Sequence, residues 1–217
     1  MTYKKENDEM EIIIDGNKID FTPNTSETVY DFLINKIRDF IPKNMVIKEI
    51  FLDDKKYDDL MIDDEKAKTF KLTSNGTLKI NTMTSDELVM QSLNSIESYF
   101  SDLLKNLGKV ADLLREGNDK EGFTDFAADL KGIGAFVQVM DKIALFLNID
   151  YSTYKYKERS IKDYFDDTEK LLSNILETQK TLDYVMLADL IDFEMEPLIK
   201  TWKEVILTLK SDIGNGK

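Results

Sequence analysis

The chain has 217 residues, of which 42% are hydrophobic and 33% are charged, and this is enough to form one large or two small folded cores. Its net charge is −13. Residues 1–84 contain 13 Lys/Arg and 17 Asp/Glu, and the residues after them contain 16 Lys/Arg and 25 Asp/Glu. Both parts are therefore acidic, and neither offers the basic surface that nucleic acids and anionic membranes bind. It contains no cysteine and no histidine, which excludes disulfides, thiol nucleophiles and thiolate or imidazole metal sites, and removes the side chain best suited to acid–base catalysis near neutral pH.

The first residues are polar and contain no apolar secretory leader, so we expect a cytoplasmic protein with a flexible segment at residues 1–9. The longest apolar run, residues 143–147, has five residues, whereas a membrane-spanning helix needs about 20. We therefore expect neither a membrane nor a nucleic acid as partner.

Strand-like spacing begins at Met10, and the run "DGN" at residues 15–17 predicts a hairpin turn between two strands. Helical spacing follows, and the predicted helix begins at an N-cap, Asn24 or Ser26, and ends at Pro42. A further strand is predicted in "VIKEIFLDD", and alternating residues around "SNG" at residues 74–76 predict a second hairpin.

The order strand, strand, helix, strand, strand is that of a β-grasp, and residues 10–84 resemble the ubiquitin-like family. The resemblance rests on "MEIIIDGNKIDF", "TSETVYDFLINKI" and "KEIFLDDKKYDD". The family's free Gly-Gly tail is missing, because the strand at Leu78–Ile80 runs on into the next segment, so conjugation is not implied. The resemblance implies a small sheet that serves either as a docking surface or as a cap for the helices that follow.

From Ser85 onward the spacing is helical, and we expect no strand beyond about residue 90. Two helical hairpins are predicted, at residues 85–147 and 158–212, joined by a Tyr/Lys-rich connector and followed by a flexible tail at residues 213–217. The predicted fold class is therefore α+β, with an N-terminal β-grasp (ββαββ-type) domain followed by an antiparallel four-helix bundle at residues 85–212.

The two predicted hairpins resemble each other. "IESYFSD" at residues 96–102 matches "IKDYFDD" at 161–167 with an offset of 65, and "AADL" at 127–130 matches "LADL" at 187–190 with an offset of 60. Either an internal duplication or the general likeness of amphipathic helices accounts for these matches, and a duplication predicts two similar αα-hairpins.

The stretch "LADLIDFEMEPLIKTWKEVI" places several carboxylates in an apolar helix. Asp189, Asp192 and Glu196 fall within an arc of about 60°, opposite the apolar residues that should line the bundle core: Leu187, Ile191, Leu198, Trp202, Val205 and Leu209. The acids should therefore face solvent. A carboxylate metal centre in a bundle would need inward-facing acids and Glu-x-x-His segments, so we expect no metal, no cofactor and no catalytic residue here.

A second apolar strip, Leu182, Met186 and Phe193, is turned away from the main face, and Pro197 extends it. A helix that is apolar on two sides must bury both, either inside the chain, against a partner protein, or against a second copy in a homodimer. The candidate partner-binding residues are Leu182, Met186, Phe193 and Trp202. Pro197 also predicts a kink.

The remaining motifs are weak. "GIGAFV" at residues 132–137 lacks the third glycine of a dinucleotide site, and Gly132 and Gly134 are better explained by close helix approach. The acidic runs at residues 53–59 and 63–65 lack the ligand spacing and the glycine of a calcium loop, which favours solvated turns.

The sequence therefore favours a non-catalytic protein-interaction module, either an adaptor or a chaperone-like protein that holds an apolar helix of its partner. Nine methionines suit such adaptable contacts. The alternative is an enzyme that uses carboxylate or Lys/Tyr acid–base chemistry in a cleft between sheet and bundle. A third hypothesis is a purely structural or dimerising subunit.

Overall fold

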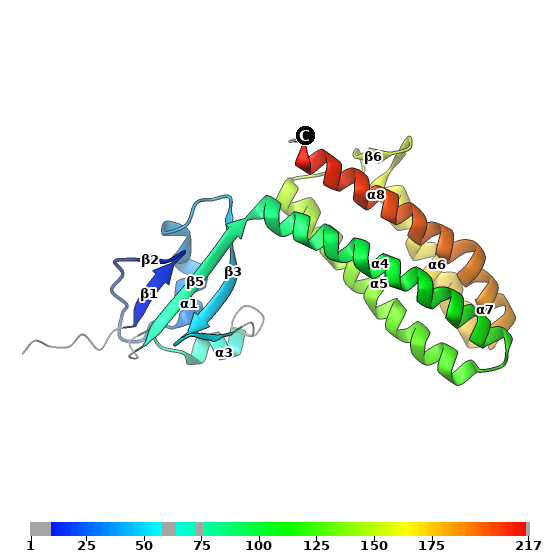
Figure 1. The fold of residues 1–217 in the computed structure, drawn as a ribbon, viewed down its shortest axis with the longest axis horizontal. Helices are drawn as coiled ribbons and strands as arrows, with labels where there is room; N and C mark the ends of the chain where they lie inside the picture. Colours follow the sequence, from blue (N-terminus) through cyan, green and yellow to red (C-terminus); the bar gives the residue numbers. More distant parts are fainter. Residues whose placement is uncertain (1–9, 58–63, 73–75, 216–217) are drawn as a thin grey trace, which may run out of the picture. The chain divides into compact units, whose positions relative to one another are not determined.

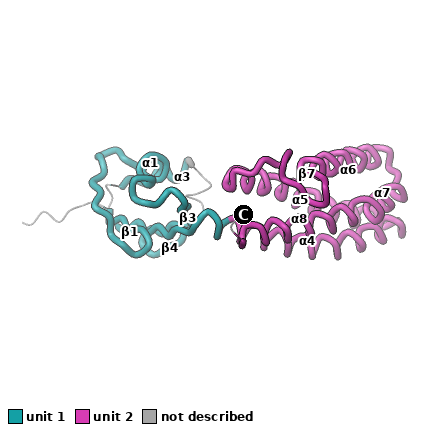
Figure 2. The backbone as a smooth tube through the Cα atoms, turned by 90° about the horizontal axis from the view of Figure 1, so that it is seen from above, with its two compact units in different colours: residues 1–88 teal, residues 89–217 magenta. Residues whose placement is uncertain are grey.

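The computed structural model describes residues 10–57, 64–72 and 76–215, and the chain forms two compact units, residues 1–88 (unit 1) and 89–217 (unit 2) (Figures 1 and 2). The protein is α+β, as expected, with a mixed sheet in unit 1 and mainly helices in unit 2. Among the described residues, no helix combines the length and the apolar character that crossing a membrane requires.

Unit 1 is built on a five-stranded sheet in the order β2-β1-β5-β3-β4 (Figure 1). β1 pairs antiparallel with β2 and parallel with β5, and β3 pairs antiparallel with β5 and β4. The bounds of the elements of unit 1 are β1 (Glu11–Ile14), β2 (Asn17–Lys18), α1 (Val29–Asn35), β3 (Met45–Leu52), β4 (Lys55–Lys56), α3 (Asp64–Thr69) and β5 (Thr77–Thr84).

α1 begins after Thr28, and not at the predicted caps Asn24 or Ser26. Thr28 Oγ1 accepts a hydrogen bond from Asp31 N at 3.2 Å, and the Asp31 carboxylate accepts one from Thr28 N at 3.0 Å. This capping box satisfies two backbone donors at once, and the hydrogen bonds from Thr28 lower the pKa of Asp31. Asn24 belongs to an earlier turn, in which its N–H donates to the Glu27 carboxylate at 3.0 Å.

α1 also ends earlier than predicted, at Asn35 and not at Pro42, and a 3₁₀ turn, Ile37–Asp39, follows it. Ile37, the first residue of this turn, is buried in the core of unit 1 together with Val29 and Phe32. The segment after Asn35 therefore still contributes to the core, although it is no longer α-helical.

The predicted hairpin around residues 74–76 is wrong as a pairing of neighbouring segments. β5 pairs with β1 and β3, which are distant in sequence, and of the described residues before it, Lys71 forms an isolated bridge with Thr28. Ser74 and Asn75 lie outside the described residues, as do residues 1–9, residues 216–217 and part of the acidic runs at 53–59 and 63–65. β5 satisfies its backbone groups through long-range partners that a local turn signal does not reveal.

Unit 2 consists of long helices that share one hydrophobic core (Figures 1 and 2). The bounds of its elements are α4 (Ser85–Arg115, which begins at the end of unit 1), α5 (Asp119–Leu147), β6 (Lys155–Tyr156), β7 (Arg159–Ser160), α6 (Ile161–Thr181), α7 (Tyr184–Leu190), a π-helical turn (Ile191–Met195) and α8 (Glu196–Gly214). α8 therefore extends into the tail that was predicted to be flexible.

An aromatic layer joins these helices: Phe100 from α4, Phe136 from α5, Phe165 from α6 and Trp202 from α8. The ring centroid of Phe136 lies 4.8 Å from that of Phe100 and 4.9 Å from that of Trp202, and Trp202 lies 4.7 Å from Phe165. Phe100 and Phe165 are 65 residues apart, as in the matched motifs, but Phe136 and Trp202 are 66 apart and not 60. The internal duplication stays a prediction.

The disturbance expected at Pro197 takes the form of a wider helical turn. In the π turn that precedes it, Glu196 N–H donates to the carbonyl of Ile191, five residues back. Pro197 has no amide hydrogen, and in a regular α-helix its ring would crowd the carbonyl of Phe193. The π turn relieves this conflict without ending the helix.

The expectation that no strand follows residue 90 is wrong, because β6 and β7 form a short antiparallel hairpin in the connector. Its turn residues, Lys157 and Glu158, both have positive φ (47° and 66°), as a type I′ turn requires. The connector lacks the Asn-Gly or Asp-Gly pair that normally announces such a turn.

Tyrosine side chains bind this connector to the helices through hydrogen bonds. Tyr151 OH donates to the carbonyl of Met140 at 2.8 Å, and Tyr154 OH donates to the Asp212 carboxylate at 2.6 Å. Burial raises the pKa of both phenols. The hairpin is therefore held by tertiary contacts, which local sequence cannot announce.

Of the two glycines predicted to allow close helix approach, only Gly132 has that role. A Cβ at Gly132 would lie 2.1 Å from the Tyr99 hydroxyl oxygen, whereas a Cβ at Gly134 would meet nothing within 4 Å. Tyr99 crosses from α4 to α5 at this point, and its hydroxyl donates to the carbonyl of Asp129 at 2.9 Å.

We predict that Gly132→Ala destabilises the protein by about 1–3 kcal/mol, because the methyl group must displace the Tyr99 ring. The matched control is Gly134→Ala, which should stabilise the protein by about 0.5–1 kcal/mol, the usual gain in a helix interior. Urea unfolding of both variants measures the difference, and equal stabilisation by the two substitutions would contradict the observed packing.

Candidate functional site

The candidate partner-binding residues separate into an exposed and a buried group. Leu182, Met186 and Phe193 are 64%, 51% and 73% exposed, and Val185, which the sequence analysis did not single out, is 62% exposed. Inside the chain, the second apolar strip is therefore left uncovered. We call these four residues the corner strip: three of them lie where α6 turns into α7, and Phe193 lies in the π turn that follows α7.

Trp202 does not belong to this surface, and its inclusion among the partner-binding residues was wrong. Its side chain is fully buried in the aromatic layer, and its Nε1–H donates to the Thr168 hydroxyl at 3.0 Å. The indole therefore has both its apolar surface and its polar group satisfied inside unit 2.

The corner strip is held outward by the turn between α6 and α7. Leu182 ends α6 in the left-handed conformation with φ of 57°, and Asp183 caps α7 by accepting a hydrogen bond from Met186 N at 3.0 Å. Phe193 lies in the π turn, between the buried residues Ile191 and Met195. The backbone of this corner is therefore ordered by hydrogen bonds, and the exposed side chains belong to a defined surface.

The acids of the same helix lie at the protein surface, as predicted, but they are ion-paired rather than free. Arg115, the last residue of α4, contacts Asp189 at 2.9 Å and Asp192 at 2.6 Å, and these hydrogen bonds raise the pKa of Arg115. Glu196 pairs with Lys200 at 2.8 Å. Among the described residues, no group of three or more acidic side chains is arranged to hold a metal ion.

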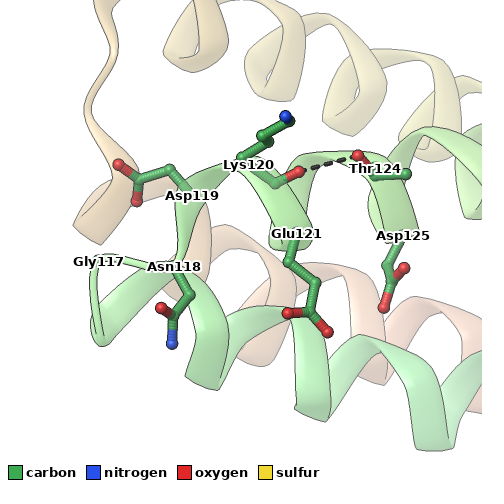
Figure 3. Close-up of a pocket in the computed structure, with 7 residues that line it drawn as sticks. All are labelled: Gly117, Asn118, Asp119, Lys120, Glu121, Thr124 and Asp125. Carbon is green, nitrogen blue, oxygen red and sulfur yellow. Dashed lines mark hydrogen bonds between the residues drawn. The ribbon is translucent and has the colours of Figure 1, made fainter.

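The beginning of α5, next to the turn between α4 and α5, contacts the beginning of α7, where the ring centroids of Phe123 and Tyr184 are 5.3 Å apart. This turn carries a shallow depression of about 530 Å³ (Figure 3), whose lining residues are Gly117, Asn118, Asp119, Lys120, Glu121, Thr124 and Asp125. Asp119 points away from Glu121 and Asp125 (Figure 3). Glu121 and Asp125 are both bridged by Lys109 of α4, at 3.3 and 2.8 Å.

Negative charge is concentrated at this end of unit 2. Residues 115–125 and 176–196 together contain three Lys/Arg and ten Asp/Glu, whereas the rest of residues 89–217 contains 13 of each. We call these two segments the acidic end. The corner strip lies within it, so its apolar side chains are set among carboxylates.

The best candidates for acid–base chemistry lie elsewhere. Asp129 is buried, and its carboxylate accepts a hydrogen bond from Asn106 Nδ2 at 2.8 Å. Burial raises the pKa of Asp129, and burial together with this carboxylate raises the pKa of Tyr99 to about 12. No second buried acid accompanies Asp129 among the described residues of unit 2.

A serine and a lysine also meet between α4 and α8, where Lys203 Nζ donates to Ser101 Oγ at 3.0 Å. The Ser101 hydroxyl itself donates to the carbonyl of Glu97 at 2.8 Å, so its proton is directed at the backbone and not at the lysine. A nucleophile activated by a base needs the opposite arrangement.

Comparison with known proteins gives one match. A family model described as a domain of unknown function (DUF8042) matches residues 91–205, which covers most of unit 2 and includes the whole corner strip. No curated protein and no solved structure matches the chain.

We predict that substitutions in the buried and in the exposed apolar group change the stability of the protein by very different amounts. Trp202→Ala should lower the free energy of unfolding by about 3–5 kcal/mol, because it empties the centre of the aromatic layer. Phe193→Ser should change it by less than about 0.5 kcal/mol, as is usual for an exposed side chain. Urea unfolding followed by circular dichroism tests both, and a large loss for Phe193→Ser would show that the strip is covered.

Asp129 predicts a pH dependence of stability. Its pKa is higher in the folded protein than the ordinary value of 3.8, so its contribution to stability falls as the pH rises through the folded pKa. Asp129→Asn, which keeps an acceptor for Asn106, should be more stable than the wild type at pH 7, and the difference should shrink as the pH falls through the folded pKa of Asp129 and level off below about 4. Asp102→Asn, at an exposed position on α4, is the control, and a less stable Asp129→Asn at pH 7 would contradict this account.

Proposed function

The chain belongs to the family of domains of unknown function DUF8042, and we propose that unit 2 is a non-catalytic protein-interaction module that docks a partner protein on the corner strip. The observation that carries this proposal is the exposure of four large apolar side chains on one ordered corner: Leu182, Val185, Met186 and Phe193. Such a group next to a complete core marks an interaction surface better than single scattered residues do.

The chemistry of the strip supports this function. Met186 is flexible and polarisable, which suits adaptable contacts, and Phe193 offers a large area to a partner. Neither residue is needed to fill the core, because the buried residues of α7 and α8 already do so. The strip is therefore free to change its contacts without unfolding the helix.

The folds of the two units support this proposal. The strand order of unit 1, with its first and last strands parallel and adjacent, supports a β-grasp fold of the ubiquitin-like kind. The shared core of α4, α5, α6 and α8 supports an antiparallel four-helix bundle. In this proposal the bundle is a rigid platform for the strip, and the protein acts as an adaptor or a chaperone-like binder of an apolar segment.

We expect a photoreactive phenylalanine analogue at position 193 to crosslink to a partner protein in native cells. The matched control is the same analogue at Leu145, which is 82% exposed but lies at the opposite end of α5. Crosslinked products identified by mass spectrometry should form at position 193 and be lost when Met186→Asp is added.

The control position should give none of these products. Absence of a product at position 193, or the same products at both positions, would contradict docking on the corner strip. A product with twice the mass of the chain would identify a homodimer instead.

A further inference from the structure

Several carboxylates of the acidic end have no cation within ion-pair distance in the part of the chain that the structure describes. Arg115, Lys109 and Lys200 neutralise the acids that they contact. The acids of this end that lack such a partner among the described residues are Glu116, Asp119, Glu177, Asp183 and Glu194. Four of these acids are exposed and keep their charge available for a bound molecule, whereas Asp119 is half-buried, with its Oδ1 buried and without a hydrogen-bond partner.

The position of these acids relative to the corner strip is specific. Glu177 precedes the strip on α6, Asp183 lies between Leu182 and Val185, and Glu194 follows Phe193 directly. All three acids are exposed. A molecule that covers the strip must therefore bring apolar groups to its centre and positive charge to its borders, since burying unpaired carboxylates under apolar groups is unfavourable.

The corner also restricts the conformation of what binds to it. The strip is displayed by helices and a helical turn, so it has no strand edge at which an extended peptide could pair its backbone. Its residues are spaced at three, four and seven positions along the chain. A helix with a matching apolar stripe packs against such a surface through side chains alone.

We infer that the partner segment that docks on the corner strip is a basic amphipathic helix, with an apolar stripe bordered by Lys or Arg. This inference rests on the proposed function and specifies its ligand. A second copy of the chain is disfavoured as the occupant, because two acidic ends facing each other would place like charges opposite one another.

Designed peptides of about 18 residues, or five helical turns, test the inference with the full-length protein. The first is a Leu/Lys amphipathic helix, the second replaces every Lys by Glu, and the third shuffles the first so that the stripe is lost. Fluorescence anisotropy at low and high salt measures binding. We expect the first peptide alone to bind, with an affinity that falls as salt increases.

Variants of the protein locate the site. The double variant Met186→Ser/Phe193→Ser should weaken binding about tenfold or more, as truncation of central contacts does, and Glu177→Gln/Glu194→Gln should weaken it mainly at low salt. Leu145→Ser, at the distant exposed position, should leave binding unchanged.

Equal binding of the Glu peptide, no binding of any peptide, or binding that is insensitive to the double variant would overturn the inference. The proposed function fails separately, when position 193 gives no specific crosslink in cells. If position 193 does crosslink, but to a segment that is acidic or extended, the surface stands as a docking site and the basic helix is wrong.

Discussion

The contact between Phe136 and Trp202 is the interaction on which unit 2 depends. Phe136 also touches Phe100, and Trp202 also touches Phe165, which in turn stacks on Phe136 at 6.2 Å, so these rings join the two helical hairpins in a continuous aromatic layer. The single tryptophan of the chain completes the layer with a hydrogen bond to Thr168. Because protein interiors are close-packed, the layer also fixes which faces of the helices turn inward.

The corner strip is a consequence of that choice of faces. Ile191 and Met195 lie in the same core as Trp202, so Phe193 between them points outward. The π turn before Pro197 keeps the same faces of α7 and α8 inward without breaking the helix. The ion pairs of Arg115 with Asp189 and Asp192 hold the end of α4 against the same corner. The core contacts and the proposed docking surface thus lie on different sides of the chain, so substitutions in the strip should not cost the fold.

Sequence reasoning identified the features that repeat regularly. The change from strand to helix near Ser85, the core face through Trp202 and the second strip at Leu182, Met186 and Phe193 all follow from apolar periodicity. It missed features that depend on contacts between distant residues: the β6–β7 hairpin held by Tyr151 and Tyr154, and the pairing of β5 with β1 and β3 in place of a local hairpin. The pairing of Arg115 with two acids 74 and 77 residues away had no local signal. Trp202 was placed both in the core and at the site because periodicity identifies an apolar face but not its depth.

Quenching of tryptophan fluorescence tests the central claim most directly, since Trp202 is the only tryptophan. If the aromatic layer closes around it, the native protein should emit like an indole in an apolar environment and resist quenching by acrylamide and iodide. Quenching should rise sharply only on unfolding in urea. Native emission and quenching like those of the unfolded chain would show that Trp202 is exposed, and would contradict both the packed layer and the division between buried and exposed faces.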